Sequence, residues 1–197
     1  MKMIDRAKIE NRATAIYSKH CKKGSPAKML PKIIAAEKIK LREIDGEDKF
    51  LGAFLKQPNG SFYIFVNRNI NNIGRKNFTL AHELGHFALN HYLHTASFLC
   101  SENEISEENE VVSDQEKEAN YFASCFLLPK NRVEREFKAW FQYHINPNGK
   151  VFLHIDPYGK SYSNWKAISS KLMKTFDVSE AALKIRLTEL GLIRFNF

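Results

Sequence analysis

The sequence predicts an α+β protein in which helices lie against a small β-sheet and a helical segment follows at the carboxyl end. Three strand-like runs follow one another between residues 38 and 67, and segments with apolar residues at helical spacing lie before and after them. The 197 residues suffice for one domain with a hydrophobic core and a small appendage. We therefore expect a main domain over residues 1–145 and a C-terminal segment over residues 146–197.

The first third of the chain supplies two helices and then the sheet. Apolar spacing predicts an N-terminal helix that ends near Gly24, and Ser25–Pro26 begins a second, short helix. The expected strands are Lys38–Ile44, Phe50–Lys56 and Ser61–Asn67. Pro58, Asn59 and Gly60 separate the last two strands, which predicts a β-hairpin.

The helix expected over Arg75–His91 carries a motif with a specific chemistry. Its residues 82–86 read H-E-L-G-H, a match to the H-E-x-x-H pattern of zinc metalloproteases. His82 and His86 are four residues apart and therefore share one helical face, so both imidazoles can bind one Zn²⁺. Glu83 lies one step round the helix, beside the open position of the metal. His82 and His86 are therefore the candidate ligands, and Glu83 is the candidate catalytic glutamate.

The same five residues can also occur by chance on a surface helix. Gly85 argues against that alternative, because a glycine inside a helix costs about 1 kcal/mol relative to alanine and usually has a packing reason. Close approach of a second helix near the metal would supply the reason.

A catalytic zinc has three protein ligands and one open position, so a third ligand should come from another element. The segment from Ser113 to Pro129 predicts a second helix that begins with a capping box, Ser113 with Glu116. Glu116 lies roughly 50° from the centre of the apolar stripe and Glu118 roughly 110°. Asn120 follows Glu116 one turn later and can hydrogen-bond a ligating histidine. We predict Glu116 as the ligand; the alternatives are Glu118, or a Glu116 that only caps the helix.

Together the two helices resemble a known family. H-E-L-G-H followed by E-K-E-A-N-Y-F-A-S-C-F-L-L-P is similar to the ImmA/IrrE family of zinc metallopeptidases (the DUF955 domain), in which an H-E-x-x-H helix precedes a helix of the type E-x-x-A-[ND]-x-F-A-x-x-[LF]-L-x-P. The resemblance covers roughly residues 25 to 145. It implies a zincin-like fold, zinc ligands at His82, His86 and Glu116, and Glu83 as the catalytic glutamate.

The resemblance also implies a biological setting. Related proteins are intracellular bacterial or mobile-element proteins, several of which relieve repression by cleaving a phage-type helix-turn-helix repressor. In zincin-like folds a sheet edge beside the metal helix can pair with an extended peptide substrate, so we expect a protein substrate bound in this way.

The C-terminal segment predicts two helices joined by a short turn. The first ends near Phe176, and Ser179 caps the second. Such a pair resembles a helix-turn-helix. It either packs on the peptidase domain or binds DNA, with candidate contacts at Lys184, Arg186 and Thr188. The second possibility defines the alternative function, a zinc-containing DNA-binding transcriptional regulator without proteolytic activity.

Composition fits a cytoplasmic globular protein. Hydrophobic residues make up 44% of the chain, and no apolar run approaches the roughly 20 residues that a membrane helix needs. The charged first residues contain no signal-peptide core. Cys21, Cys100 and Cys125 are odd in number and irregularly spaced, so no disulfide framework is expected.

Two further features have more than one interpretation. Eight acidic residues lie between Ser101 and Glu118 although the chain carries a net charge of +8, which predicts either a solvated loop or a mobile flap over the site. The histidines outside the motif, His91 among them, are expected to be structural. His154, flanked by turns, is the exception that could stabilise an oxyanion.

Overall fold

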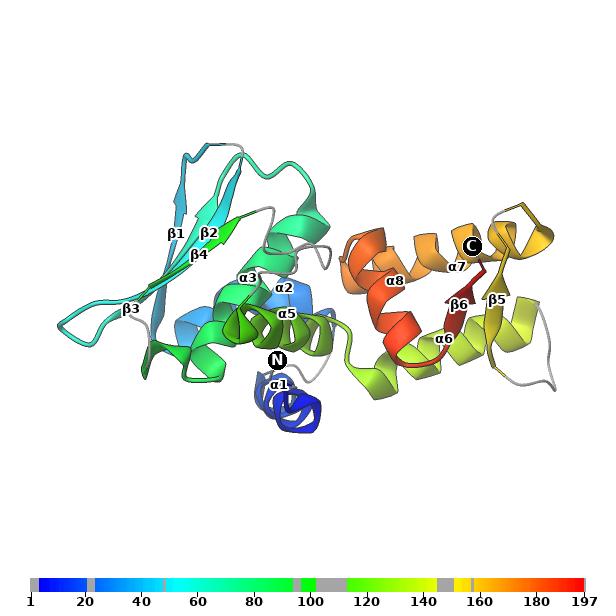
Figure 1. The fold of residues 1–197 in the computed structure, drawn as a ribbon, viewed down its shortest axis with the longest axis horizontal. Helices are drawn as coiled ribbons and strands as arrows, with labels where there is room; N and C mark the ends of the chain where they lie inside the picture. The colour runs from blue at the N-terminus through cyan, green and yellow to red at the C-terminus, as the bar shows by residue number, and fades with distance from the viewer. Residues whose placement is uncertain are drawn as a thin grey trace.

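The computed structural model describes residues 4–20, 24–47, 49–93, 97–101, 113–144, 151–156 and 158–196. In Figure 1 these residues form two lobes that lie side by side. The first lobe contains a four-stranded sheet with helices α1 (Arg6–His20), α2 (Pro26–Ala36), α3 (Ile73–Ala88) and α5 (Asp114–Leu127). The second contains α6 (Lys130–His144), α7 (Lys160–Phe176), α8 (Glu180–Glu189) and the short strands β5 (Leu153–Ile155) and β6 (Ile193–Phe195). The α+β class is confirmed.

The main sheet is mixed. Its strands are β1 (Ile39–Ile44), β2 (Phe50–Lys56), β3 (Phe62–Asn67) and β4 (Ser97–Ser101), in the order β1-β3-β2-β4. The expected hairpin is confirmed, because β2 pairs antiparallel with β3. β1 pairs parallel with β3, and β4 pairs antiparallel with β2. β4, which the sequence did not predict, forms the edge of the sheet nearest to the metal-binding motif.

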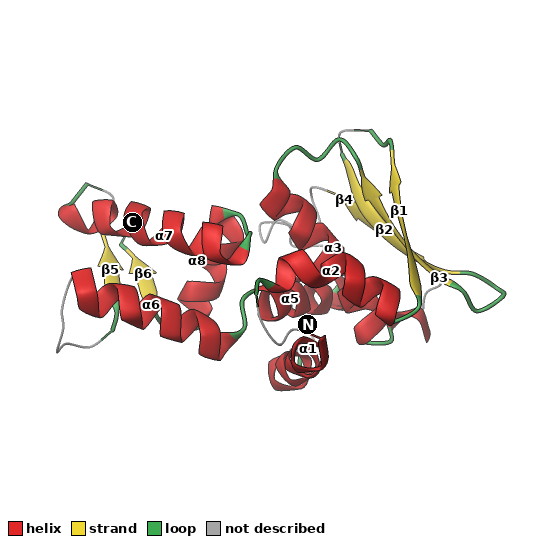
Figure 2. Ribbon diagram, turned by 180° about the vertical axis from the view of Figure 1, so that it is seen from behind, coloured by secondary structure: helices red, strands yellow, loops and turns green. Residues whose placement is uncertain are grey.

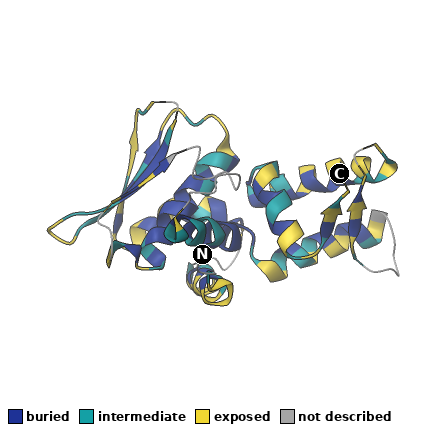
Figure 3. Cartoon of the chain, viewed as in Figure 1, coloured by how far each residue is buried: buried dark blue, intermediate teal, exposed yellow. Residues whose placement is uncertain are grey.

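Helices cover one side of this sheet, as Figure 2 shows from behind. Phe54 and Ile64 face each other across the hairpin and are fully buried. They belong to one hydrophobic cluster with Leu84 of α3 and Phe122 of α5. Figure 3 shows buried residues along α3 and the inner strands, whereas β1 and the hairpin tip are largely exposed. The motif helix is therefore held between the sheet and α5.

The motif helix differs from the expectation at its end. It begins at Ile73, where the side chain of Asn72 accepts a hydrogen bond from Arg75 N, and it ends at Ala88 rather than at His91. Asn90 adopts a left-handed conformation with φ of 62°, which asparagine tolerates better than most residues and which stops the helix. His91 begins a single 3₁₀ turn, η1 (His91–Leu93).

The second lobe contains the predicted pair of C-terminal helices. Ser179 caps α8 by accepting a hydrogen bond from Ala182 N. β5 and β6 pair in parallel, and β6 was not predicted. Helix α6, which we placed in the first domain, lies beside α7 in Figure 1. The boundary expected at 145–146 falls in residues 145–150, outside the described part of the chain. Among the described residues, no helix has both the length and the apolar character needed to cross a bilayer.

Polar contacts to main-chain atoms join the two lobes. Asn77 Nδ2 donates to Asp177 O at 2.8 Å, and Ser25 Oγ donates to Phe176 O at 3.0 Å. At the start of α3, Gly74 packs directly on the turn between α7 and α8. A Cβ at this position would lie 2.5 Å from Val178 C and would also overlap Ser179 N. Gly74 therefore permits the contact between the turn and the motif helix.

We predict that Gly74→Ala lowers the free energy of unfolding by about 2–3 kcal/mol, because the added methyl group meets main-chain atoms that cannot rotate away. The control is Gly159→Ala, where the three atoms nearest to the added Cβ belong to the side chain of Asp156, Oδ2 at 3.0 Å. Chemical denaturation of both variants tests the prediction, and equal loss in the two would contradict it.

Candidate metal centre

Three buried side chains from two helices converge at one point. His82 and His86 come from α3, and Glu116 comes from α5. The Nε2 atoms of the two histidines are 3.0 Å apart. Glu116 Oε2 lies 2.9 Å from His82 Nε2, and Glu116 Oε1 lies 3.4 Å from His86 Nε2. The structure thus brings together the three residues predicted as ligands; Glu118 is not among them.

Close packing of α3 on α5 positions this group. A Cβ at Gly85 would lie 3.0 Å from Phe122 Cδ1 and 3.3 Å from Ala119 Cα. Any larger residue would therefore push α5 away from α3. This is the helix approach that the glycine inside the motif predicted, and it brings Glu116 within reach of both histidines.

The donor set fits a divalent metal ion. His82 Nδ1 donates to Asn120 Oδ1 at 2.8 Å, which leaves a lone pair on Nε2. Two imidazole lone pairs and a carboxylate facing one another in a buried site repel unless a cation lies between them. In a tetrahedral site with zinc–nitrogen bonds of about 2.0–2.1 Å, neighbouring ligand atoms are about 3.3 Å apart. The distances of 2.9, 3.0 and 3.4 Å are close to that value.

Protonation states agree with metal binding. Burial disfavours the charged imidazole of His86, and the neighbouring His82 adds to this effect, so the pKa of His86 falls to about 4. Burial alone would raise the pKa of Glu116, but its close interactions with His82 and His86 outweigh burial and lower that pKa to about 2. At pH 7 the site therefore offers a neutral imidazole and an ionised carboxylate, the forms that bind metal.

Glu83 is fully buried beside the metal-binding group. Its carboxylate lies over Gly52 of β2, where a Cβ would be 3.1 Å from Glu83 Oε1 and 2.6 Å from Thr79 Cγ2. The pairing of β2 with β4 is irregular between Phe50 and Gly52. Glu83, His82 and Cys100 of β4 also offer possible ligand atoms within 4.8 Å of one another. Gly52 thus leaves the space that the Glu83 carboxylate occupies.

Other residues considered from the sequence lie elsewhere. His154 is exposed on β5 in the second lobe, so it does not join the site as an oxyanion-stabilising group. Most of the acidic segment 101–118 falls in residues 102–112, outside the described residues. Sequence reasoning missed His91, which is buried and hydrogen-bonded to His86. Its only sequence signal was its position five residues after the motif.

The DNA contact proposed for Arg186 on α8 needs correction. Arg186 is buried, and it donates to Glu10 Oε1 at 2.6 Å and to Leu128 O at 3.2 Å. Lys184 Nζ lies 4.1 Å from the ring centre of Phe195. Arg186 therefore holds α8 against the first lobe, because its buried charge is stabilised by Glu10 and by the carbonyl oxygen of Leu128.

Two histidines and a glutamate that converge beside a further buried glutamate form the kind of site found in metallopeptidases. The chain belongs to the family of the IrrE N-terminal-like domain, a peptidase family whose model matches residues 35–188. The match extends well past residue 145, where the motif resemblance ended, and includes α6, α7 and most of α8. No curated protein matches the chain.

We predict that the purified protein binds about one divalent metal ion per chain, and that His86→Ala removes it, because two remaining ligands cannot hold zinc tightly. His154→Ala is the matched control and should keep the metal, since that side chain is exposed in the other lobe. Elemental analysis of the three proteins gives the answer. Equal metal content in all three would refute the assignment of the site.

Proposed function

We propose that the protein is a zinc-dependent endopeptidase that acts inside the cell on a protein regulator, such as a phage-type helix-turn-helix repressor. The observation that carries this proposal is the convergence of His82, His86 and Glu116 beside the buried carboxylate of Glu83. Three protein ligands leave one position open, which a catalytic site needs and a structural zinc site does not. A glutamate beside the ligands has no role in a purely structural site.

The residues take distinct roles in this reaction. His82, His86 and Glu116 hold the ion, and when bound Zn²⁺ supplies a Lewis acid that polarises the scissile carbonyl and acidifies a water molecule. Glu83 accepts the proton of the attacking water and passes it to the leaving amine. Asn120 orients His82 through the hydrogen bond to Nδ1. Gly52 keeps room for the carboxylate that moves the proton.

The sheet offers a binding mode for the substrate. β4 is an edge strand, and among the described strands it pairs only with β2. Its residues alternate, with Phe98 and Cys100 buried toward the site and Leu99 exposed on the other face. An extended peptide added along β4 would form main-chain hydrogen bonds next to Glu83 and the metal ligands. This geometry favours an extended segment of a protein over a small molecule.

The alternative function, a DNA-binding regulator without proteolysis, has less support. A recognition helix needs exposed side chains that reach the bases. On α8, Arg186 is buried and ion-paired with Glu10, and Lys184 lies against Phe195. Thr188 remains exposed, but one threonine is not a basic surface.

We predict that Glu83→Gln lowers cleavage of the substrate by at least about 10²-fold, because the amide keeps the size of the side chain but cannot accept a proton. Zinc content and folding should stay close to those of the wild-type protein, since Glu83 is not a ligand. Co-expression with a helix-turn-helix repressor encoded beside this protein should give two discrete fragments with the wild type and intact repressor with the variant.

Lys184→Ala is the control for the alternative function and should leave cleavage unchanged. A cellular response that survives Glu83→Gln with zinc still bound, but is lost in Lys184→Ala, would overturn the peptidase proposal in favour of the regulator.

A further inference from the structure

We propose that His91 and Glu118 are positioning residues that fix the tautomer and the orientation of His86 for metal binding. The inference rests on the metal site of the proposed function. It concerns two residues that lie outside that site: His91 in η1 and Glu118 in α5.

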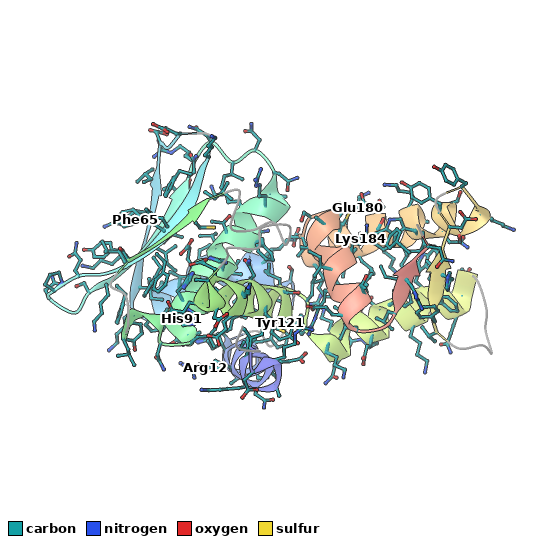
Figure 4. The ribbon with its side chains drawn as sticks, in the orientation of Figure 1. Arg12, Phe65, His91, Tyr121, Glu180 and Lys184 are labelled. Atoms are coloured by element: carbon teal, nitrogen blue, oxygen red, sulfur yellow. The ribbon has the colours of Figure 1, made fainter. Side chains whose placement is uncertain are left out.

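A chain of two hydrogen bonds leads away from the metal site. His86 Nδ1 and His91 Nδ1 are 2.9 Å apart, and His91 Nε2 lies 3.0 Å from Glu118 Oε2. His91 is buried, whereas about a third of the Glu118 side chain is exposed. Figure 4 labels His91 in the first lobe, near α3 and α5. The two hydrogen bonds therefore join the motif helix to α5 through the turn that follows the motif.

The carboxylate of Glu118 determines which atoms donate and which accept in these two hydrogen bonds. Glu118 can only accept, so His91 carries its hydrogen on Nε2 and donates it to Oε2. The other nitrogen of His91, Nδ1, is then an acceptor and receives the hydrogen of His86 Nδ1. His86 Nε2 is left with a lone pair that faces His82 and Glu116. In the opposite tautomer the hydrogen of His86 would lie on Nε2 and would block the metal.

The way in which helix α3 ends brings the ring of His91 to the ring of His86. In an uninterrupted helix His91 would lie about 140° round the axis from His86, and the two rings could not meet edge to edge. The left-handed residue Asn90 ends the helix and turns His91 back. Phe98 of β4 stacks on the His86 ring with centroids 4.1 Å apart and planes at 19°. The face of His86 is thus fixed by Phe98 and its edge by His91.

The two ligating histidines are supported unequally. His82 donates to the neutral amide of Asn120, whereas His86 donates to an imidazole that is itself bonded to a carboxylate. A carboxylate at the end of such a chain raises the basicity of the ligand, and loss of outer partners typically lowers metal affinity by roughly 10- to 100-fold. Glu118, the competitor of Glu116 in the sequence, thus acts on the site through His91.

The test uses the full-length protein with His91→Phe and Glu118→Gln. Phenylalanine keeps an aromatic ring beside Phe98 but cannot accept a hydrogen bond. Glutamine keeps the size of Glu118, but its amide can donate as well as accept and no longer selects one tautomer. The matched controls are His154→Phe and Glu134→Gln, both in the second lobe. Thermal unfolding of each variant establishes that it is folded.

Two readouts are expected to change. Competition with a chelator should show zinc affinity lowered roughly 10- to 100-fold in His91→Phe and by a smaller factor in Glu118→Gln, with the controls at the wild-type value. Nitrogen NMR of the metal-free protein should show His86 protonated at Nδ1 in the wild type and a mixture of tautomers in both variants.

The inference is overturned if both folded variants bind zinc within about twofold of the wild type, or if His86 keeps one tautomer in both. If His91→Phe does not fold, Glu118→Gln alone decides. Failure of the proposed function looks different: zinc binds and His86 responds to the variants, but no repressor is cleaved and Glu83→Gln changes nothing.

Discussion

The contact between α3 and α5 at Gly85 is the constraint on which the site depends. A Cβ there would touch both the main chain and a side chain of α5, so the distance between the two helices is set by the absence of a side chain. That distance decides four contacts at once. Glu116 reaches the two motif histidines, Asn120 reaches His82, and Glu118 reaches His91. The peptidase-family model that matches residues 35–188 spans both helices.

Burial gives the same site its chemistry. Burial disfavours charge on His86 and lowers its pKa, whereas the pKa of Glu116 is lowered against the effect of burial by its interactions with His82 and His86. The imidazole lone pairs of His82 and His86 and the carboxylate of Glu116 then repel one another in a site without water. A bound cation offsets this repulsion. Affinity for a metal ion is therefore a consequence of how the core is packed as well as of which ligands are present.

Local patterns predicted much of this arrangement. The four-residue spacing placed His82 and His86 on one face, the capping box placed the start of α5, and a helix glycine predicted the close packing. Local patterns failed where distant pairing decides structure. β4 and β6 are short and exist because they pair with β2 and β5. Arg186 looked like a surface cation because its partner, Glu10, is 176 positions away. The helix was predicted to run to His91, but one left-handed residue, Asn90, follows its earlier end at Ala88.

The ion pair between Arg186 and Glu10 has a consequence for how the chain is made. Arg186 pairs with Glu10 at 2.6 Å and with Glu189 at 3.6 Å, so without Glu10 this buried guanidinium keeps only the longer of these two ion pairs and is destabilised. Glu10 precedes Arg186 by 176 positions, so α1 is synthesised long before it can complete this contact. The motif helix and α5 emerge in between. Assembly of the metal ligands can thus precede the contact that ties α1 to α8.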